Sequence, residues 1–386
     1  MPYYSPLKKL LPSDRNRTIE GLQRLRQQME DEKFPKKQMT SSLILGTWNI
    51  RNFDDDRFNY GPRLTESLYY IAEIISRFDV IAIQEICVDL WPLKKLMRIL
   101  GANYDYIVTD VTHSSVGGNQ ERLGFIYNKN KVRFSGIAGE IVLPDKLMIS
   151  EAAGRKRQFS RTPFGAEFQS GWFKFYFSTV HIFFGSNRGN TPQYKRRVDE
   201  INAVARYLGR EAKNSDSNHI LVGDFNIKER GSDGFNALEA NGFKTVKNRK
   251  GSNRDQTKFY DQISFRSKKN ELVFLEPNRD DRVIQFFNSI FRKEDFTIYK
   301  PIIKKMIGKK RKRVQELLEI ETSKTKRKKL VRQIKSLDEA NSSEASLIEY
   351  YLEWRTFQAS DHLPLWVEIK IDFSEQYLEH LKTLES

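Results

Sequence analysis

The chain of 386 residues is long enough to bury a sizeable core, and it is 39% hydrophobic and 12% aromatic, which excludes a disordered chain. Lys and Arg number 66 against 50 Asp and Glu, a formal net charge of +16, and this balance favours polyanionic partners such as nucleic acid or an anionic membrane surface. Cys87 is the single cysteine, so no intrachain disulfide can form, and the absence of a run of about 18 apolar residues argues against a membrane span.

Residues 1–41 are predicted to form an N-terminal helical extension. Ile19, Leu22, Leu25 and Met29 give one apolar stripe on an otherwise charged helix that ends near Pro35. The opening residues lack the apolar core of a signal peptide, so we expect an intracellular, cytoplasmic protein. The same features are compatible with a secreted protein that has no disulfides.

From Leu43 onward, short apolar runs typical of buried strands alternate with amphipathic helical patterns. Strands are expected at 43–50, 80–86, 104–110, 123–128, 219–223, 259–265 and 363–370, and a hairpin at 164–182 with its turn at 169–171. Helices are expected from Leu68 to Ile75, from Pro92 to Leu100, and from Pro192 to Leu208 behind an N-cap at Thr191. This alternation predicts two packed sheets with helices on the outside.

Between Arg266 and Thr356 the pattern changes to long helical stretches rich in Lys and Arg, and we interpret 267–356 as a basic helical insertion. A first helix with an apolar face is expected at Val283, Ile284, Phe287, Ile290 and Phe291. The runs 309–313 and 324–329 have three interpretations: a track for a phosphate backbone, a nuclear import signal, or a solvated helix face. Residues 373–386 are expected to form a C-terminal helix behind a capping box.

Polar residues suited to metal-assisted phosphodiester cleavage follow or lie within the apolar strands, where α/β sheets present their functional loops. These residues are Asn49, Glu85, His181, Asp224, Asn226, Asp261, Asp361 and His362. Each residue taken alone is more often a turn, cap or structural residue. Their combination favours a catalytic site.

The same strings, in the same order, resemble the endonuclease/exonuclease/phosphatase superfamily, which includes deoxyribonuclease I. They are TWNI (47–50), QE (84–85), ERLGFIY (121–127), STVH (178–181), GDFN (223–226), YDQI (260–263) and SDH (360–362). The resemblance covers 43–371 apart from the insertion. It implies a four-layer α/β sandwich of two mainly antiparallel sheets in a domain over 42–372.

The resemblance also implies a divalent cation site for Mg²⁺, with Mn²⁺ as the alternative cation. Glu85 matches the principal ligand, with Asn49 beside it and Asp361 as a second or water-mediated carboxylate. This set suits a hard cation, because Mg²⁺ takes oxygen ligands and bridges substrate phosphate oxygens. The metal would polarise the phosphoryl group.

Four further residues match catalytic positions of the family. His362 matches the histidine beside the attacking water, and Asp261 matches the aspartate that orients this histidine. Asp224 and Asn226 match the pair that positions the nucleophile and contacts the phosphate. His181 matches the histidine that binds the phosphate and assists the leaving group. Arg122 is expected to bind a phosphate oxygen, the alternative being a simple ion pair with its neighbour Glu121. Phe183 and Phe184, which follow His181, have three interpretations: stacking on a base, insertion into lipid, or plain packing in the core. His113 stays outside this site as a solvated loop histidine.

We therefore expect a Mg²⁺-dependent DNA endonuclease or exonuclease that binds its partner, DNA, through phosphate contacts. The string GDFN resembles the nuclease branches more than the GDLN string of many inositol phosphatases. The alternative is an inositol-phosphate or sphingolipid phosphoesterase, with the basic insertion and its Phe286, Phe287 and Phe291 on an anionic membrane. A third class, a basic scaffold with an inactive site, is disfavoured because the whole polar set is present.

Overall fold

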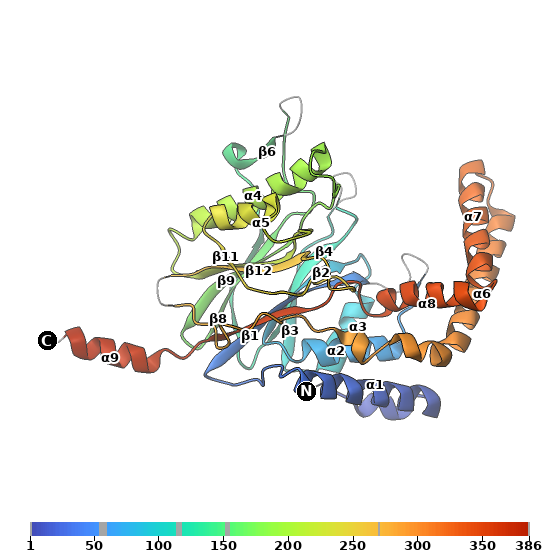
Figure 1. The fold of residues 1–386 in the computed structure, drawn as a ribbon, viewed down its shortest axis with the longest axis horizontal. Helices are drawn as coiled ribbons and strands as arrows, with labels where there is room; N and C mark the ends of the chain where they lie inside the picture. The colour runs from blue at the N-terminus through green and yellow to red at the C-terminus, as the bar shows by residue number, and fades with distance from the viewer. Residues whose placement is uncertain (1, 54–59, 113–117, 151–154, 269–270, 385–386) are drawn as a thin grey trace.

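The computed structural model describes residues 2–53, 60–112, 118–150, 155–268 and 271–384, and in it two β-sheets pack face to face between layers of helices (Figure 1). The first sheet follows the order β13 (Leu365–Lys370), β1 (Ser42–Phe53), β2 (Val80–Ile86), β4 (Arg122–Asn128) and β3 (Tyr104–Val108). The second follows the order β11 (Lys244–Thr245), β12 (Asp261–Arg266), β10 (Asn218–Asp224), β9 (Phe173–His181), β8 (Phe164–Ser170) and β5 (Arg133–Glu140). A small separate sheet pairs β6 (Ile149–Ser150) with β7 (Lys156–Arg157).

Each large sheet contains one parallel pair, β1 with β2 and β9 with β10, and its other neighbours pair antiparallel. Phe125 of the first sheet and Phe177 and Ile263 of the second are fully buried in the core between the two sheets. Strand β10 is buried at every residue because it lies inside its sheet with cover on both faces. The predicted sandwich of mainly antiparallel sheets is confirmed.

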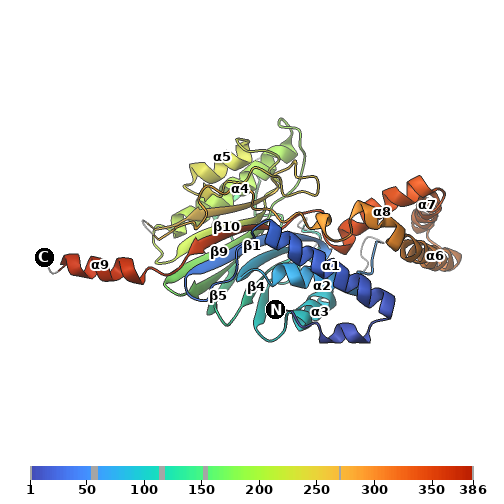
Figure 2. The ribbon, with the colours of Figure 1, turned by 60° about the horizontal axis from the view of Figure 1, so that its bottom comes forward.

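Helices α1 (Pro12–Asp31), α2 (Thr65–Ile75) and α3 (Trp91–Leu100) lie on the side of the first sheet, and α4 (Pro192–Glu211) and α5 (Asp233–Ala240) on the side of the second (Figure 2). Helix α4 starts as predicted, since Thr191 Oγ1 accepts a hydrogen bond from Tyr194 N and Pro192 follows at the first helical position. Its apolar residues Ile201 and Val204 are fully buried.

The N-terminal helix α1 packs on α2. Leu22, Leu25 and Met29 are buried as the apolar stripe predicts, whereas Ile19 is 37% exposed and lies outside the packed face. Arg17 Nε donates to both carboxylate oxygens of Glu66 at 3.0 and 2.8 Å, so a charged pair adds to the apolar contact.

The prediction of a helix over residues 283–291 is wrong. This segment contains only the short 3-10 turn Phe286–Asn288, and Val283 forms a β-bridge with Leu365 while Ile284 N donates to Pro364 O. Its apolar residues are buried, but by an irregular chain packed on the body, so their helical spacing is fortuitous. Further 3-10 turns lie at Ser5–Lys9, Asp145–Leu147 and Lys293–Asp295.

The basic region forms three helices, α6 (Phe296–Ile320), α7 (Lys324–Ala340) and α8 (Glu344–Gln358), and α6 and α7 extend beyond the edge of the sandwich in both views (Figures 1 and 2). Helix α8 leads back to the sheet edge just before β13. The chain ends with α9 (Ser374–Leu384), which projects away from the body. Within the described residues, no helix is both long and apolar enough for a membrane crossing.

Candidate active site

Strand pairing in the second sheet brings three predicted residues to one edge. Parallel β9 and β10 pair His181 with Asp224, and antiparallel β12 places Asp261 opposite Asp224. Gly223, in the same loop string, has φ +128°, and a Cβ there would lie 2.1 Å from Val180 O. Glycine is therefore required for β10 to approach β9 at this point.

The first sheet supplies Asn49 and Glu85 to the same edge. Parallel pairing aligns Asn49 with Gln84, and the register of β2 shifts between Ile83 and Ile86, on either side of Glu85. Glu85 has φ +61°, a left-handed conformation that is unusual for a residue with a long side chain. Such a bulge redirects a side chain, and here it turns the carboxylate of Glu85 toward Asn49.

His362 and Asp261 form a buried pair. His362 Nδ1 lies 2.8 Å from Asp261 Oδ2, and its Nε2 lies 3.8 Å from Asp224 Oδ2. Burial disfavours the charged ring, but the carboxylates of Asp261 and Asp224 outweigh burial and raise the pKa of His362 well above its ordinary value. The ring of Tyr260 lies over the imidazole with centroids 5.5 Å apart.

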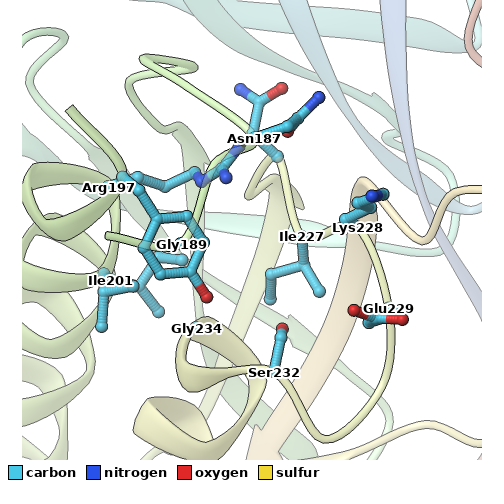
Figure 3. Close-up of a pocket in the computed structure, with 12 residues that line it drawn as sticks. Asn187, Gly189, Arg197, Ile201, Ile227, Lys228, Glu229, Ser232 and Gly234 are labelled. Carbon is cyan, nitrogen blue, oxygen red and sulfur yellow. Dashed lines mark hydrogen bonds between the residues drawn. The ribbon is translucent and has the colours of Figure 1, made fainter. Parts of the chain in front are cut away.

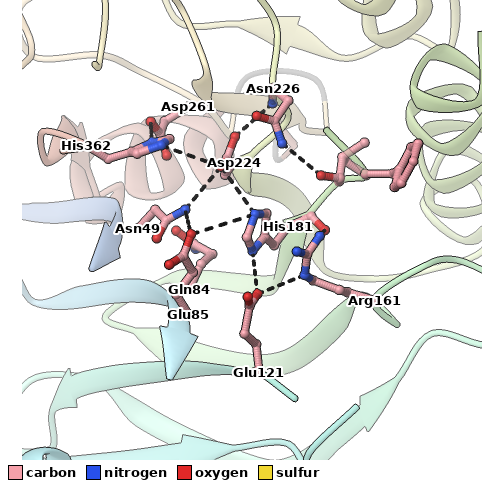
Figure 4. A network of polar contacts seen from close by, with 12 residues as sticks. Asn49, Gln84, Glu85, Glu121, Arg161, His181, Asp224, Asn226, Asp261 and His362 are labelled. Atoms are coloured by element: carbon pink, nitrogen blue, oxygen red, sulfur yellow. Dashed lines mark hydrogen bonds and ion pairs between the residues drawn. The ribbon is translucent and has the colours of Figure 1, made fainter. Parts of the chain in front are cut away.

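A second histidine pair, which the sequence only half revealed, lies opposite the first (Figure 4). His181 Nδ1 is 3.0 Å from Glu121 Oε2, and Arg161 Nε donates to the same oxygen at 2.8 Å. Burial alone would raise the pKa of Glu121, but His181 and Arg161 lower it to about 2. Glu121 is therefore paired with His181 and Arg161, and the alternative interpretation of Arg122 as its ion-pair partner is wrong.

Asp224 lies between the two imidazoles and connects the two sheets (Figure 4). Its Oδ2 lies 3.5 Å from His181 Nε2 and accepts a hydrogen bond from Asn49 Nδ2 at 3.1 Å. Its Oδ1 accepts from the backbone N of Asn226 at 2.8 Å, and the Asn226 side chain donates to Ile182 O. Asp224 is 2% exposed, so its oxygens are fixed by this network.

Glu85 and Asn49 present oxygens that fit a hard cation. Asn49 Oδ1 is buried and has no hydrogen-bond partner among the described residues, whereas Asn49 Nδ2 donates to Glu85 Oε1 at 2.9 Å. Burial and the negative charge of Glu121 raise the pKa of Glu85, and Asp361 adds to the effect. A cation beside these oxygens would satisfy the orphaned carbonyl and relieve the repulsion.

The oxygens of Asp224 and Asp261 and a ring nitrogen of His362 also lie within 4.8 Å of one another, a grouping that could hold a metal ion. The 2.8 Å contact between His362 Nδ1 and Asp261 already engages one ring nitrogen and one carboxylate. A cation bound by this trio would compete with that contact, whereas Asn49 Oδ1 has no competing partner among the described residues.

The remaining predicted positions lie around this centre. Arg122 donates to Cys87 O at 2.7 Å and Val88 O at 3.0 Å, and its phosphate contact stays a prediction. Asp361 is near Arg51, with 3.6 Å between its Oδ2 and Arg51 Nε. His113 lies outside the described residues. Phe183 and Phe184 stack on arginines of α4 at 4.2 and 5.9 Å and do not join the core.

A search of curated proteins gives no match. Solved structures that resemble the chain include a mannosyl-6-phosphatase of Bacteroides thetaiotaomicron, with 20% identity, a TM-score of 0.43, and 58% of this chain and 85% of that one covered. Another is an endonuclease/exonuclease/phosphatase family protein of the same organism. It has 16% identity and a TM-score of 0.46, and the match covers 86% of this chain and 99% of that one. A third is D. rerio TDP2 complexed with a single-strand DNA product. It has 18% identity and a TM-score of 0.40, and the match covers 60% of this chain and 90% of that one.

The model of the Endonuclease/Exonuclease/phosphatase family matches residues 46–272, which include six of the seven strings that the sequence resemblance used. Members of this superfamily are hydrolases that act on phosphoesters and generally depend on a divalent metal. Because the match covers more than half of the chain, this protein belongs to the endonuclease/exonuclease/phosphatase family.

Proposed function

We propose that this protein is a Mg²⁺-dependent phosphodiesterase that hydrolyses the backbone of DNA. The observation that supports it most directly is the meeting of two histidine–carboxylate pairs at Asp224, beside the oxygens of Asn49 and Glu85. Phosphodiester hydrolysis requires a group that accepts a proton from water, another that protonates the leaving oxygen, and positive charge near the phosphate. The edge offers a residue for each task.

Glu85, Asn49 and Asp361 would hold Mg²⁺, which when bound polarises the phosphoryl group and takes up developing negative charge. His362, kept charged by Asp261, donates to a phosphate oxygen. Asp224 accepts the proton of the attacking water.

On the other side of the centre, His181 donates a proton to the leaving oxygen. The ionised carboxylate of Glu121 fixes its Nδ1, so that Nε2 faces the reaction centre.

The choice of DNA rests on charge. Residues 296–340, the hairpin of α6 and α7, contain 15 of the 66 Lys and Arg but only 5 of the 50 Asp and Glu. On the outward face of α7, Lys324, Lys328, Arg332 and Lys335 follow one another at helical spacing, and all four are exposed. A phosphate backbone is the partner whose charge density matches such a face.

The test is incubation of labelled single- and double-stranded DNA and RNA with Mg²⁺ or with EDTA. We expect Mg²⁺-dependent cleavage of DNA, and loss of cleavage in Glu85→Gln. Cleavage of RNA alone would mean that the substrate is RNA and not DNA. No cleavage of any nucleic acid, together with release of phosphate from sugar phosphates, would overturn the proposal that the protein is a nuclease.

A lipid phosphoesterase is the second candidate. Its original support is wrong, because Phe286, Phe287 and Phe291 are 0%, 7% and 0% exposed and cannot lie on a membrane. A different observation favours it: Ile320, at the tip of the basic hairpin, is 76% exposed and Leu317 is 43% exposed. Sedimentation with anionic vesicles and turnover of inositol phosphates or sphingomyelin would distinguish the two candidates.

A further inference from the structure

A pocket of about 160 Å³ (Figure 3) adjoins the predicted reaction centre through Asn226, a lining residue whose backbone N donates to Asp224 Oδ1 at 2.8 Å. Its walls are the start of α4, the start of α5 and the loop that follows β10. Val198, Ile201 and Ile227 supply apolar lining, and Arg197 supplies a charged side chain. The catalytic steps proposed above use none of the residues that line this pocket.

Arg197 is a buried cation without a matching anion. It is 3% exposed, and its guanidinium donates to Ser186 O at 2.8 Å and Asn187 Oδ1 at 3.3 Å, both neutral acceptors. Among the described residues no carboxylate lies within 4.0 Å of it. Burying a charge is costly unless an opposite charge compensates it, so an anion bound in the pocket would complete this site.

The other polar features of the pocket also suit an anion. Tyr194, in the first turn of α4, and Ser232 and Gly234, at the start of α5, line it. The amino ends of both helices therefore border the pocket, and each contributes partial positive charge there. Glu229, the one carboxylate among the lining residues, is exposed next to Lys228.

We propose that this pocket binds a second phosphate group of the substrate, adjacent to the phosphodiester that is cleaved, with Arg197 as its ligand. The inference rests on the proposed function of the neighbouring centre. Asn226 lines the pocket and its backbone N donates to Asp224 Oδ1 at 2.8 Å, so the pocket and the reaction centre are neighbours that two phosphates of one substrate molecule can occupy. The enzyme then prefers substrates with consecutive phosphates, such as polynucleotides, over those with a single phosphate.

The test compares three thymidine dinucleotides, which differ only in terminal phosphates. TpT has one phosphodiester and no other phosphate, whereas pTpT and TpTp carry an additional phosphate at the 5′ or the 3′ end. With Mg²⁺ we expect the additional phosphate at one of the two ends to lower KM about tenfold or more, because a charge-assisted contact has that effect. Arg197→Gln should lose this preference and keep the kcat for TpT, and Arg197→Lys should retain part of it.

Arg206→Gln is the matched control. Arg206 is an exposed arginine on the same helix, and its substitution removes the same charge at a position outside the pocket. Equal KM values for the three dinucleotides, or an equal loss on all three in Arg197→Gln, would overturn the pocket. Binding of the dinucleotides in EDTA, with inorganic phosphate as competitor, separates the two proposals. A preference dependent on Arg197 without any hydrolysis would refute the nuclease and retain the phosphate pocket, and hydrolysis without that preference would do the reverse.

Discussion

The catalytic edge of the sandwich and the hairpin of α6 and α7 use charge in opposite ways. At the edge, Asp224, Asp261 and Glu121 are 2%, 3% and 5% exposed, and a carboxylate oxygen of each lies within 3.5 Å of a histidine or an arginine nitrogen. On the hairpin most charged side chains are exposed, where ion pairs are weak and salt screens them. The edge is therefore built for chemistry, and the hairpin for association with a partner.

The largest effect separates the two regions most clearly. We expect His362→Ala to lower kcat on the order of a thousandfold for long DNA and for a small phosphodiester alike, because the lost group acts on the phosphate itself. Measurement of kcat for plasmid DNA and for bis(p-nitrophenyl) phosphate checks this. A loss limited to plasmid DNA would mean that His362 serves binding and not chemistry.

The next prediction compares the two histidine pairs within the edge. Asp261→Asn and Glu121→Gln each remove the charge that orients an imidazole and keep its shape, so each should lower kcat roughly tenfold to a hundredfold. Thermal unfolding of both variants shows whether the fold is intact. If Glu121→Gln had the activity of the parent protein, the assignment of His181 as the proton donor would fall.

The sequence predicted one of these pairs and missed half of the other for a structural reason. Residues that follow an apolar parallel strand reach the edge together, so His181 and Asp224 could be found from local strings. Glu121 precedes β4 and reaches the same edge because β4 runs antiparallel to β2. The string ERLGFIY contained Glu121, but only strand direction shows that its carboxylate, not that of a more distant residue, orients His181.

Tertiary contacts set the other limits of prediction. Asp224 and Asp261 are brought together by the register of β10 and β12, which no local pattern encodes. Arg161 lies in an irregular segment, where periodicity carries no signal. The helix expected over 283–291 failed because burial of an irregular chain can produce the same apolar spacing as a helix.

The third prediction addresses the hairpin. Replacement of Lys324, Lys328, Arg332 and Lys335 by Gln should weaken the binding of long duplex DNA. It should also reduce the magnitude of the slope of log K against log salt by about 3 to 4, because fewer counterions are released from DNA when fewer phosphates are contacted. The kcat for bis(p-nitrophenyl) phosphate should not change. Fluorescence anisotropy over a salt series measures the slope.

A matched control removes the same number of positive charges from the end of the sheets that lies opposite the catalytic edge. Lys129, Arg133, Lys213 and Lys244 are exposed near the ends of strands and helices opposite the catalytic edge. Their fourfold Gln variant should keep the salt slope of the parent protein. Equal slopes for both variants would show that DNA responds to net charge and not to the hairpin.

The smallest effect concerns His219, a buried histidine with no carboxylate within 4.0 Å among the described residues, in contrast to His181 and His362. It is 4% exposed, neither ring nitrogen has a hydrogen-bond partner among the described residues, and burial with the charge of Arg266 lowers its pKa from 6.5 to about 4. The unfolded chain therefore binds a proton between pH 6.5 and pH 4 that the folded protein resists, so stability falls as the pH falls through this window. From pH 7 to pH 5 the protein should lose about 2 kcal/mol that His219→Phe retains. Urea unfolding at both pH values measures the difference, and an equal loss in the two proteins would show that His219 remains accessible to protons in the folded state.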